Sequence, residues 1–176
     1  RPVVAQAGLF VLPDSHPDDM FPRNIVVFGD VGVNATMTPE VLAEVAVGTC
    51  MMARDLIPED VLPEIRGAVV SYSNRGSDEG PSPELVRRAM EKVPAILEAR
   101  AARYERYRSI RLSGEVKVSV ALSRRSAEMH GNPDEACGNN VIICPNLDMG
   151  NLLYHLYGTR FPEARKCAVL FGLGSR

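Results

Sequence analysis

The stretch Val141-Ile142-Ile143-Cys144-Pro145-Asn146-Leu147-Asp148-Met149-Gly150-Asn151 carries the pattern that decides the fold, because an apolar run ends in a polar turn and a helical pattern follows. The same order occurs where residues 25–28 lead into residues 29–34, and where residues 68–70 lead into residues 71–77. Short apolar runs bounded by Gly, Asn, Asp and Ser are typical of buried strands. Their alternation with helices predicts an α/β fold with a doubly wound, largely parallel sheet. Ligands bind such sheets at the carboxyl ends of the strands, where the three polar loops would meet.

Length and charge narrow the class of protein. The 176 residues, 45% of them hydrophobic and 24% charged, suffice for one compact domain over residues 1–176. A formal net charge of -2 provides no strongly basic surface for nucleic acid or an anionic membrane. No apolar run reaches membrane-spanning length. We therefore expect a cytoplasmic protein that binds small molecules, with no nucleic-acid and no membrane partner.

Cysteine and histidine positions argue against metal and disulfide chemistry. The four cysteines, none in a CxxC pair, are Cys50, Cys137, Cys144 and Cys167. Two of them, Cys144 and Cys167, lie in apolar strand-like runs, so we expect reduced, buried thiols. The three histidines, in separate segments without metal-ligand spacing, are His16, His130 and His155. We expect no bound metal.

Two helices have clear start signals. Thr38 suits the N-cap and Pro39 the first helical position, and apolar residues recur on one face of the segment that follows. A second helix is expected from Ser82, with a break or kink at Pro94. Residues 98–111 are charged and suggest a solvated helix face.

Three shorter elements are expected in the second half of the chain. Residues 115–121 alternate at period two, which predicts a strand with one polar face. Residues 152–157 predict a short helix that stops at Gly158, and residues 168–171 predict a further strand.

The loop at residues 71–77 has the composition of an anion site. Its hydroxyls, amide, guanidinium and glycine come from Ser71, Tyr72, Ser73, Asn74, Arg75, Gly76 and Ser77. A phosphate or carboxylate would accept charge-assisted hydrogen bonds from Arg75 and neutral ones from Ser73 and Ser77. An ordinary surface turn has the same composition, so the sequence leaves both interpretations open.

The loop at residues 145–151 leads into a helix, where Asn151 would cap the helix or donate toward a ligand. Taken alone it is a capping loop. It lacks the Gly-Lys-Ser/Thr ending of a Walker loop, and the chain has no GxGxxG dinucleotide fingerprint.

As a set, the loops resemble the phosphate acetyl/butyryltransferase family. Residues 145–147, Gly150-Asn151 and Tyr154 resemble its Pro-Asp-Leu-x-x-Gly-Asn-x-x-Tyr-Lys signature. The family's serine loop resembles residues 71–77, its Asp-x-x-Val-Asn turn resembles residues 30–34, and its Asp-Gly-Glu segment resembles Ser113-Gly114-Glu115. Members are roughly twice as long. The chain resembles their C-terminal half, as a fragment or a shortened member.

The resemblance implies reversible acyl transfer between coenzyme A and inorganic phosphate. It implies a two-lobed fold related to the isocitrate and isopropylmalate dehydrogenases, an active site between the lobes, and a homodimer. Coenzyme A and acyl-coenzyme A would be substrates, with no covalently bound cofactor. Asn146 and Asn151 are the expected catalytic residues. The expected phosphate or substrate ligands are Ser71, Ser73, Asn74, Arg75, Gly76, Ser77, Asn34 and Gly150. Tyr72, Met149 and Leu152 are candidates for an acyl pocket, and core packing is the favoured alternative for Leu152.

Departures from the family pattern leave a second function open. Asn146 stands where the family has Asp, His155 where it has Lys, and Ser113 where it has Asp. The family's Leu-Ser-Arg segment has no clear counterpart, although residues 174–176 offer Ser-Arg. These changes permit a non-catalytic regulatory or assembly module that kept the fold. A nicotinamide-dependent dehydrogenase of the related fold is disfavoured because the glycine fingerprint is missing.

Overall fold

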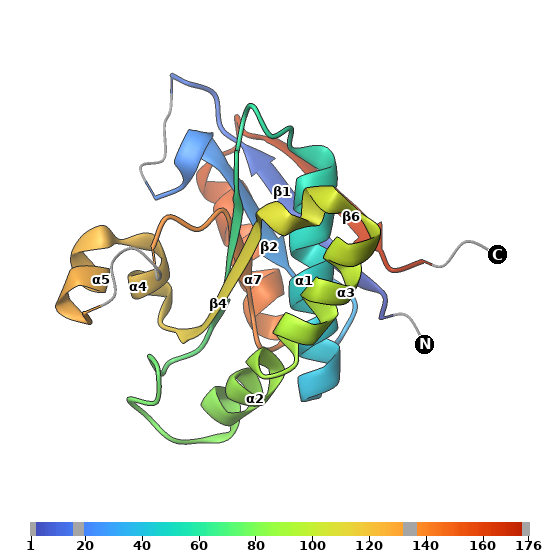
Figure 1. The fold of residues 1–176 in the computed structure, drawn as a ribbon. Helices are drawn as coiled ribbons and strands as arrows, with labels where there is room; N and C mark the ends of the chain where they lie inside the picture. The colour runs from blue at the N-terminus through green and yellow to red at the C-terminus, as the bar shows by residue number, and fades with distance from the viewer. Residues whose placement is uncertain (1–2, 16–19, 132–136, 174–176) are drawn as a thin grey trace.

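A mixed sheet with the strand order β4-β3-β5-β2-β1-β6 forms the centre of the molecule (Figure 1). The computed structural model describes residues 3–15, 20–131 and 137–173. The strands are β1 (Ala5–Val11), β2 (Ile25–Gly29), β3 (Ile65–Val70), β4 (Ile110–Val116), β5 (Val141–Ile143) and β6 (Arg165–Phe171). Within the sheet, β4, β3, β5 and β2 are parallel, whereas β1 is antiparallel to both β2 and β6. The expected α/β fold and largely parallel sheet are confirmed.

Helices cover both faces of the sheet, because the central strands bury side chains on both sides. One core joins the sheet to α1 (Pro39–Leu56), α2 (Pro81–Met90) and α3 (Val93–Arg103). The other joins it to α4 (Val118–Leu122), α5 (Arg124–Met129) and α7 (Leu147–Arg160). Along β2, Val27 belongs to the first core, and its neighbours Val26 and Phe28 belong to the second. Two short 3-10 segments are η1 (Pro22–Asn24) and η2 (Glu105–Ser109).

The first predicted helix is confirmed in detail. Thr38 Oγ1 accepts a hydrogen bond from the backbone N of Val41 at 3.3 Å, and Pro39 begins α1. The predicted apolar face is buried at Leu42, Val45, Ala46, Thr49 and Met52. The second predicted helix is also present. It is interrupted after Met90, where α2 ends, and α3 begins at Val93. Pro94 lies in the first turn of α3, where its missing N–H is tolerated.

One expectation about residues 98–121 was wrong. A second, the solvated helix face at residues 98–111, holds only for residues 98–103 of α3, of which all but Ala101 are exposed. The predicted strand at residues 115–121 ends at Val116, and α4 follows, because Val120 and Ala121 are adjacent and both pack into the second core. The strand itself begins at Ile110, at the end of the segment expected to be a solvated helix face. There Tyr107 is buried and joins the first core.

The last helix and strand also differ from expectation. α7 continues through Gly158 to Arg160, and it begins at Leu147 rather than residue 152. Leu152 is 63% exposed, not in the core. Cys167 is exposed as well, because β6 is an edge strand, whereas Cys50 and Cys144 are buried as expected.

Candidate functional site

The three polar loops lie at one edge of the sheet, because β2, β5 and β3 are parallel neighbours and each loop follows the carboxyl end of one of them. This arrangement was expected from the sequence. The residues of the three loops fall into two groups, one around Asp30 and one around Glu115.

Asp30 organises the loop after β2. Its side chain is completely buried, and its Oδ1 atom accepts hydrogen bonds from the backbone N atoms of Gln6, Gly32 and Val33 at 3.0–3.2 Å. Its Oδ2 atom accepts from the backbone N and the side-chain amide of Asn34. The Asn34 amide also donates to the carbonyl of Val4 at 2.9 Å. Asn34, an expected ligand residue, therefore uses its amide to hold the loop together.

The start of α7 packs on this first loop. Asn146 is the N-cap, and its side chain accepts from the backbone N of Met149 at 3.0 Å. Of the two alternatives for Asn151, the capping one was wrong, because Asn151 lies inside α7. Its Nδ2 atom donates to the carbonyl of Val31 at 3.2 Å. Gly150 is buried directly against the carbonyl of Asp30. The structure thus brings Asn34, Gly150 and Asn151 together.

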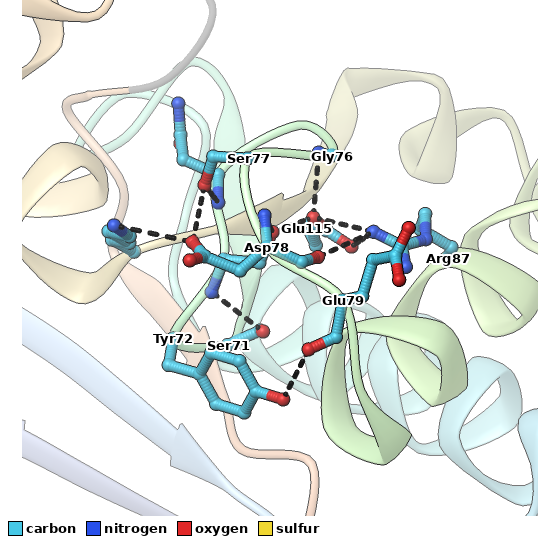
Figure 2. A network of polar contacts seen from close by, with 11 residues as sticks. Ser71, Tyr72, Gly76, Ser77, Asp78, Glu79, Arg87 and Glu115 are labelled. Atoms are coloured by element: carbon cyan, nitrogen blue, oxygen red, sulfur yellow. Dashed lines mark hydrogen bonds and ion pairs between the residues drawn. The ribbon is translucent and has the colours of Figure 1, made fainter.

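The serine loop, residues 71–77, is held on the buried carboxylate of Glu115 (Figure 2). The backbone N of Gly76 donates to Glu115 Oε1 at 2.8 Å, and the hydroxyl of Ser73 donates to the same oxygen. Arg87 Nη1, from α2, donates to both carboxylate oxygens at 2.9–3.1 Å. The backbone N of Arg75 donates to the carbonyl of Glu115 at 3.2 Å. A carboxylate from β4 therefore occupies donors that the sequence assigned to a ligand.

Further bonds inside the loop fix its inner side. The hydroxyl of Ser71 accepts from the backbone N of Ser73 at 3.1 Å, and the hydroxyl of Ser77 accepts from the backbone N of Asn74 at 2.9 Å. The buried Oδ1 atom of Asn74 has no hydrogen-bond partner among the described residues. An orphan acceptor of this kind is a place where water or a ligand donor would bind.

The outer side of the loop is open to solvent and charged. Arg75, Gly76, Ser77 and Asp78 are all exposed, and Tyr72 is 54% exposed with its hydroxyl bonded to the carbonyl of Glu79 at 3.0 Å. The hydroxyl of Ser77 donates to Asp78 at 2.7 Å and, together with nearby Lys117, holds the pKa of the Asp78 carboxyl below its usual value. Asp78 is therefore an ionised neighbour of the loop at neutral pH.

A cavity of about 760 Å³ lies beside the serine loop, along the edge strand β4. Its charged lining consists of Arg66, Arg75, Arg87, Arg111, Glu64 and Glu115, and its other residues include Met90, Leu112, Ser113 and Asn139. Volumes of this size are typical of small-molecule sites. Apart from Arg75 and Gly76, none of the cavity's residues was among the expected ligands.

The structure does not test the functional roles that the sequence assigned to individual residues. The catalytic and ligand roles assigned to Asn146, Asn151, Asn34, Gly150 and the serine loop are untested and stay predictions. Sequence reasoning did not identify Arg87 and Glu115 as a pair, although Glu115 lies in one of the recognised motifs. The Ser-Arg sequence at residues 174–176 and His16 lie outside the described residues.

Neither a metal cluster nor a membrane helix occurs in the part of the chain that the structure describes. Over residues 3–15, 20–131 and 137–173, no three His, Cys, Asp or Glu side chains are grouped so that they could hold a metal ion. In the same ranges, no helix is both long and apolar enough to cross a membrane.

Comparison with known proteins gives consistent matches. Residues 3–167 match the family described as phosphate acetyl/butaryl transferase. A phosphate acetyltransferase of Clostridium acetobutylicum is 27% identical over 165 residues, which cover 93% of this chain and 44% of the relative. An NADP-dependent malic enzyme of Salmonella typhimurium is 29% identical over 139 residues, covering 78% of this chain but 16% of that protein. The fold is similar to that of a phosphotransacetylase from Streptococcus pyogenes, with a TM-score of 0.72 at 24% identity over 98% of this chain and 46% of that one. The chain thus spans less than half the length of these relatives.

Proposed function

This chain belongs to the phosphate acetyl/butaryl transferase family, and we propose that it takes part in reversible acyl transfer between acyl-coenzyme A and inorganic phosphate. The observation that carries the proposal is the serine loop, which is anchored on Glu115 while Arg75 and Ser77 stay exposed. Arg75 would bind phosphate by charge-assisted hydrogen bonds. Ser77 would add a neutral donor once its hydroxyl turns from Asp78 toward the phosphate. Ser73 and Gly76, which bond to Glu115, would position these groups.

The start of α7 would supply the remaining donors. Asn151, and Asn146 at the N-cap, lie at the same sheet edge as the serine loop. In the proposed mechanism, the site holds phosphate beside the thioester, and these amides stabilise the tetrahedral oxyanion that forms on attack. Departure of the coenzyme A thiolate then completes the transfer.

The family resemblance extends the proposal to the whole protein. Coenzyme A and its acyl thioester would be substrates, and no cofactor would be bound covalently. The active site would lie between two lobes, in a fold related to the isocitrate and isopropylmalate dehydrogenases. The protein would be a cytoplasmic homodimer.

A thiol-release assay tests the proposal. The purified chain, with its folding checked by circular dichroism, is offered acetyl-, propionyl- and butyryl-coenzyme A with and without phosphate. We expect phosphate-dependent thiol release, reduced about tenfold or more by Arg75→Ala, because loss of one charge-assisted contact is worth at least about 1.4 kcal/mol. The control Arg125→Ala replaces an exposed arginine on α5 and should have no effect. If Arg75→Ala and Arg125→Ala release thiol at the same rate, Arg75 does not bind the phosphate.

A second candidate function is a non-catalytic regulatory or assembly module. It is favoured by the internal use of expected ligand groups, since Ser73, Asn34 and Asn146 all bond within the chain. A similar segment also forms a small part of a protein named as a malic enzyme. No thiol release from the folded chain with any of the three thioesters would favour this function over acyl transfer.

A further inference from the structure

Two arginines lie directly opposite each other on neighbouring strands. Arg66 on β3 and Arg111 on the edge strand β4 are register partners in a parallel pair, so both project from the same face of the sheet. Their Cα atoms are about 5 Å apart in such a pair. The two guanidinium groups therefore concentrate positive charge at one part of the cavity wall, where they would bind an anion.

The cavity along β4 gathers two further guanidinium groups. Arg75 reaches it from the serine loop and Arg87 from α2, so four different elements each contribute one arginine. The lining also contains Glu64 and Glu115, which leaves a formal net charge of +2. The lining as a whole therefore suits a ligand with at least two negative charges.

The two carboxylates differ in how firmly they are held. Glu115 is buried and accepts from Arg87, Ser73 and Gly76, so its charge is fixed in place. Glu64 is half exposed, and its oxygen lies 3.5 Å from Arg111 Nε. Exposed ion pairs of this kind contribute little to the stability of the folded protein. A ligand anion would readily replace Glu64 beside Arg111.

Backbone contacts hold the Arg111 guanidinium at the rim. Its Nη1 atom donates to the carbonyls of Arg108 at 2.6 Å and Ile110 at 3.0 Å. The side chain is thus oriented before any ligand arrives, which lowers the entropic cost of binding. Met90 and Leu112 also line the cavity, and both pack against the first core.

We propose that this cavity binds a small molecule that carries two linked phosphoryl groups, with Arg66 and Arg111 as its principal ligands. Each planar guanidinium matches the oxygens of one phosphoryl group. A volume of about 760 Å³ exceeds what a diphosphate fills and leaves room for its organic part. The diphosphate would come either from coenzyme A or from a free nucleoside diphosphate. The inference rests on the arginines and does not require that the chain is catalytic.

Calorimetric titration with inorganic pyrophosphate tests the site. Wild type should bind it saturably, and Arg66→Met and Arg111→Met should each weaken binding about tenfold or more. Arg125→Met on α5 is the matched control and should bind like wild type. Circular dichroism checks each fold, and exposed Arg111 gives an informative variant even if half-buried Arg66 is needed for folding. No saturable binding, or equal binding by wild type and Arg111→Met, overturns the proposal.

Two further titrations identify the source of the diphosphate. Tighter binding of coenzyme A than of ADP assigns the site to the acyl carrier, whereas binding of ADP at least as tight assigns it to a free nucleotide. Thiol release measured on the same variants separates this inference from acyl transfer. Pyrophosphate binding without thiol release supports the diphosphate site and contradicts the acyltransferase proposal. Thiol release without pyrophosphate binding supports the acyltransferase proposal and overturns the diphosphate site.

Discussion

Gly150 has no room for a side chain. A Cβ atom at this position would overlap the backbone carbonyl oxygen of Asp30, which cannot rotate away as a side chain can. The contact is where α7 meets the first loop, so the glycine fixes the distance between the two. Its place in the recognised signature has a packing reason as well as any functional one.

We expect Gly150→Ala to lower the free energy of unfolding by about 1–3 kcal/mol, the usual cost of overpacking. Gly158→Ala is the matched control, because it lies on the same helix and its Cβ would lie 3.4 Å from a Phe10 ring atom, an ordinary contact. Helix propensity should then leave Gly158→Ala unchanged or up to about 1 kcal/mol more stable. Urea denaturation measures both. Equal effects would show that the Asp30 contact does not limit Gly150.

Glu115 carries the second residue-scale prediction. In Glu115→Gln, the amide group would face donors from Ser73 and Arg87, and the charge that Arg87 pairs with would be lost. We expect a loss of about 1.5–3 kcal/mol in the free energy of unfolding, the usual contribution of a hydrogen bond to a charged group. Glu64→Gln, which affects an exposed pair with Arg111, should cost at most about 1 kcal/mol. Urea unfolding curves that coincide for the two variants would contradict a bracing role for Glu115.

At the scale of elements, Asn146 caps the N-terminus of α7, and its structural role can be tested separately from a catalytic one by measuring stability alone. Asn146→Ala removes the acceptor for the backbone N of Met149 and should cost about 0.5–2 kcal/mol. Asn146→Asp keeps a capping oxygen and places a negative charge at the helix N-terminus, so its stability should match or exceed that of wild type. Thermal unfolding of the three proteins checks the order. If Asp lowered stability as much as Ala, the side chain would not act as a cap.

Elements with local signals were predictable, and those set by distant contacts were not. Thr38, Pro39 and the apolar face of α1 act within a few residues, so the sequence indicated that helix correctly. The strand β4 was misplaced because its pairing with β3, from Ile65 opposite Ile110, joins residues far apart in the chain. Gly158 does not end α7, because Tyr157 is buried against Phe10 and Phe28 and packing overrides the weak helix propensity of glycine.

The same limit applies to the candidate site. Loop composition at residues 71–77 indicated donors for an anion, and the loops do lie at one sheet edge. It did not indicate that Glu115, 42 residues from Ser73, already bonds to two of those donors. Nor did it indicate that Arg66 and Arg111 would lie side by side, since that depends on strand register.

At the scale of the molecule, two cores share the central strands, and each contains one buried cysteine. Cys50 belongs to the core under α1, and Cys144 to the core under α7. Burial raises the pKa of the Cys144 thiol to about 12 and raises that of Cys50 as well, so neither forms a reactive thiolate while the protein is folded. Cys167 on β6 is exposed. The reactivity of Cys167 therefore reports on the edge strand β6, that of Cys50 on the core under α1, and that of Cys144 on the core under α7.

We expect Cys167 to react first with a disulfide reagent such as Ellman's. Cys50 and Cys144 should react at about one thousandth of that rate or below, because their exposure requires unfolding. A Cys137→Ser, Cys167→Ser variant leaves only the two buried thiols. Because β2, β3 and β5 contribute side chains to both cores, the two thiols should become reactive together as urea increases. Quenched samples, digested and analysed by mass spectrometry, give each rate separately. Modification of Cys144 while Cys50 stays protected would show that the α7 layer opens independently of the α1 layer, and the two cores would then not be one cooperative unit.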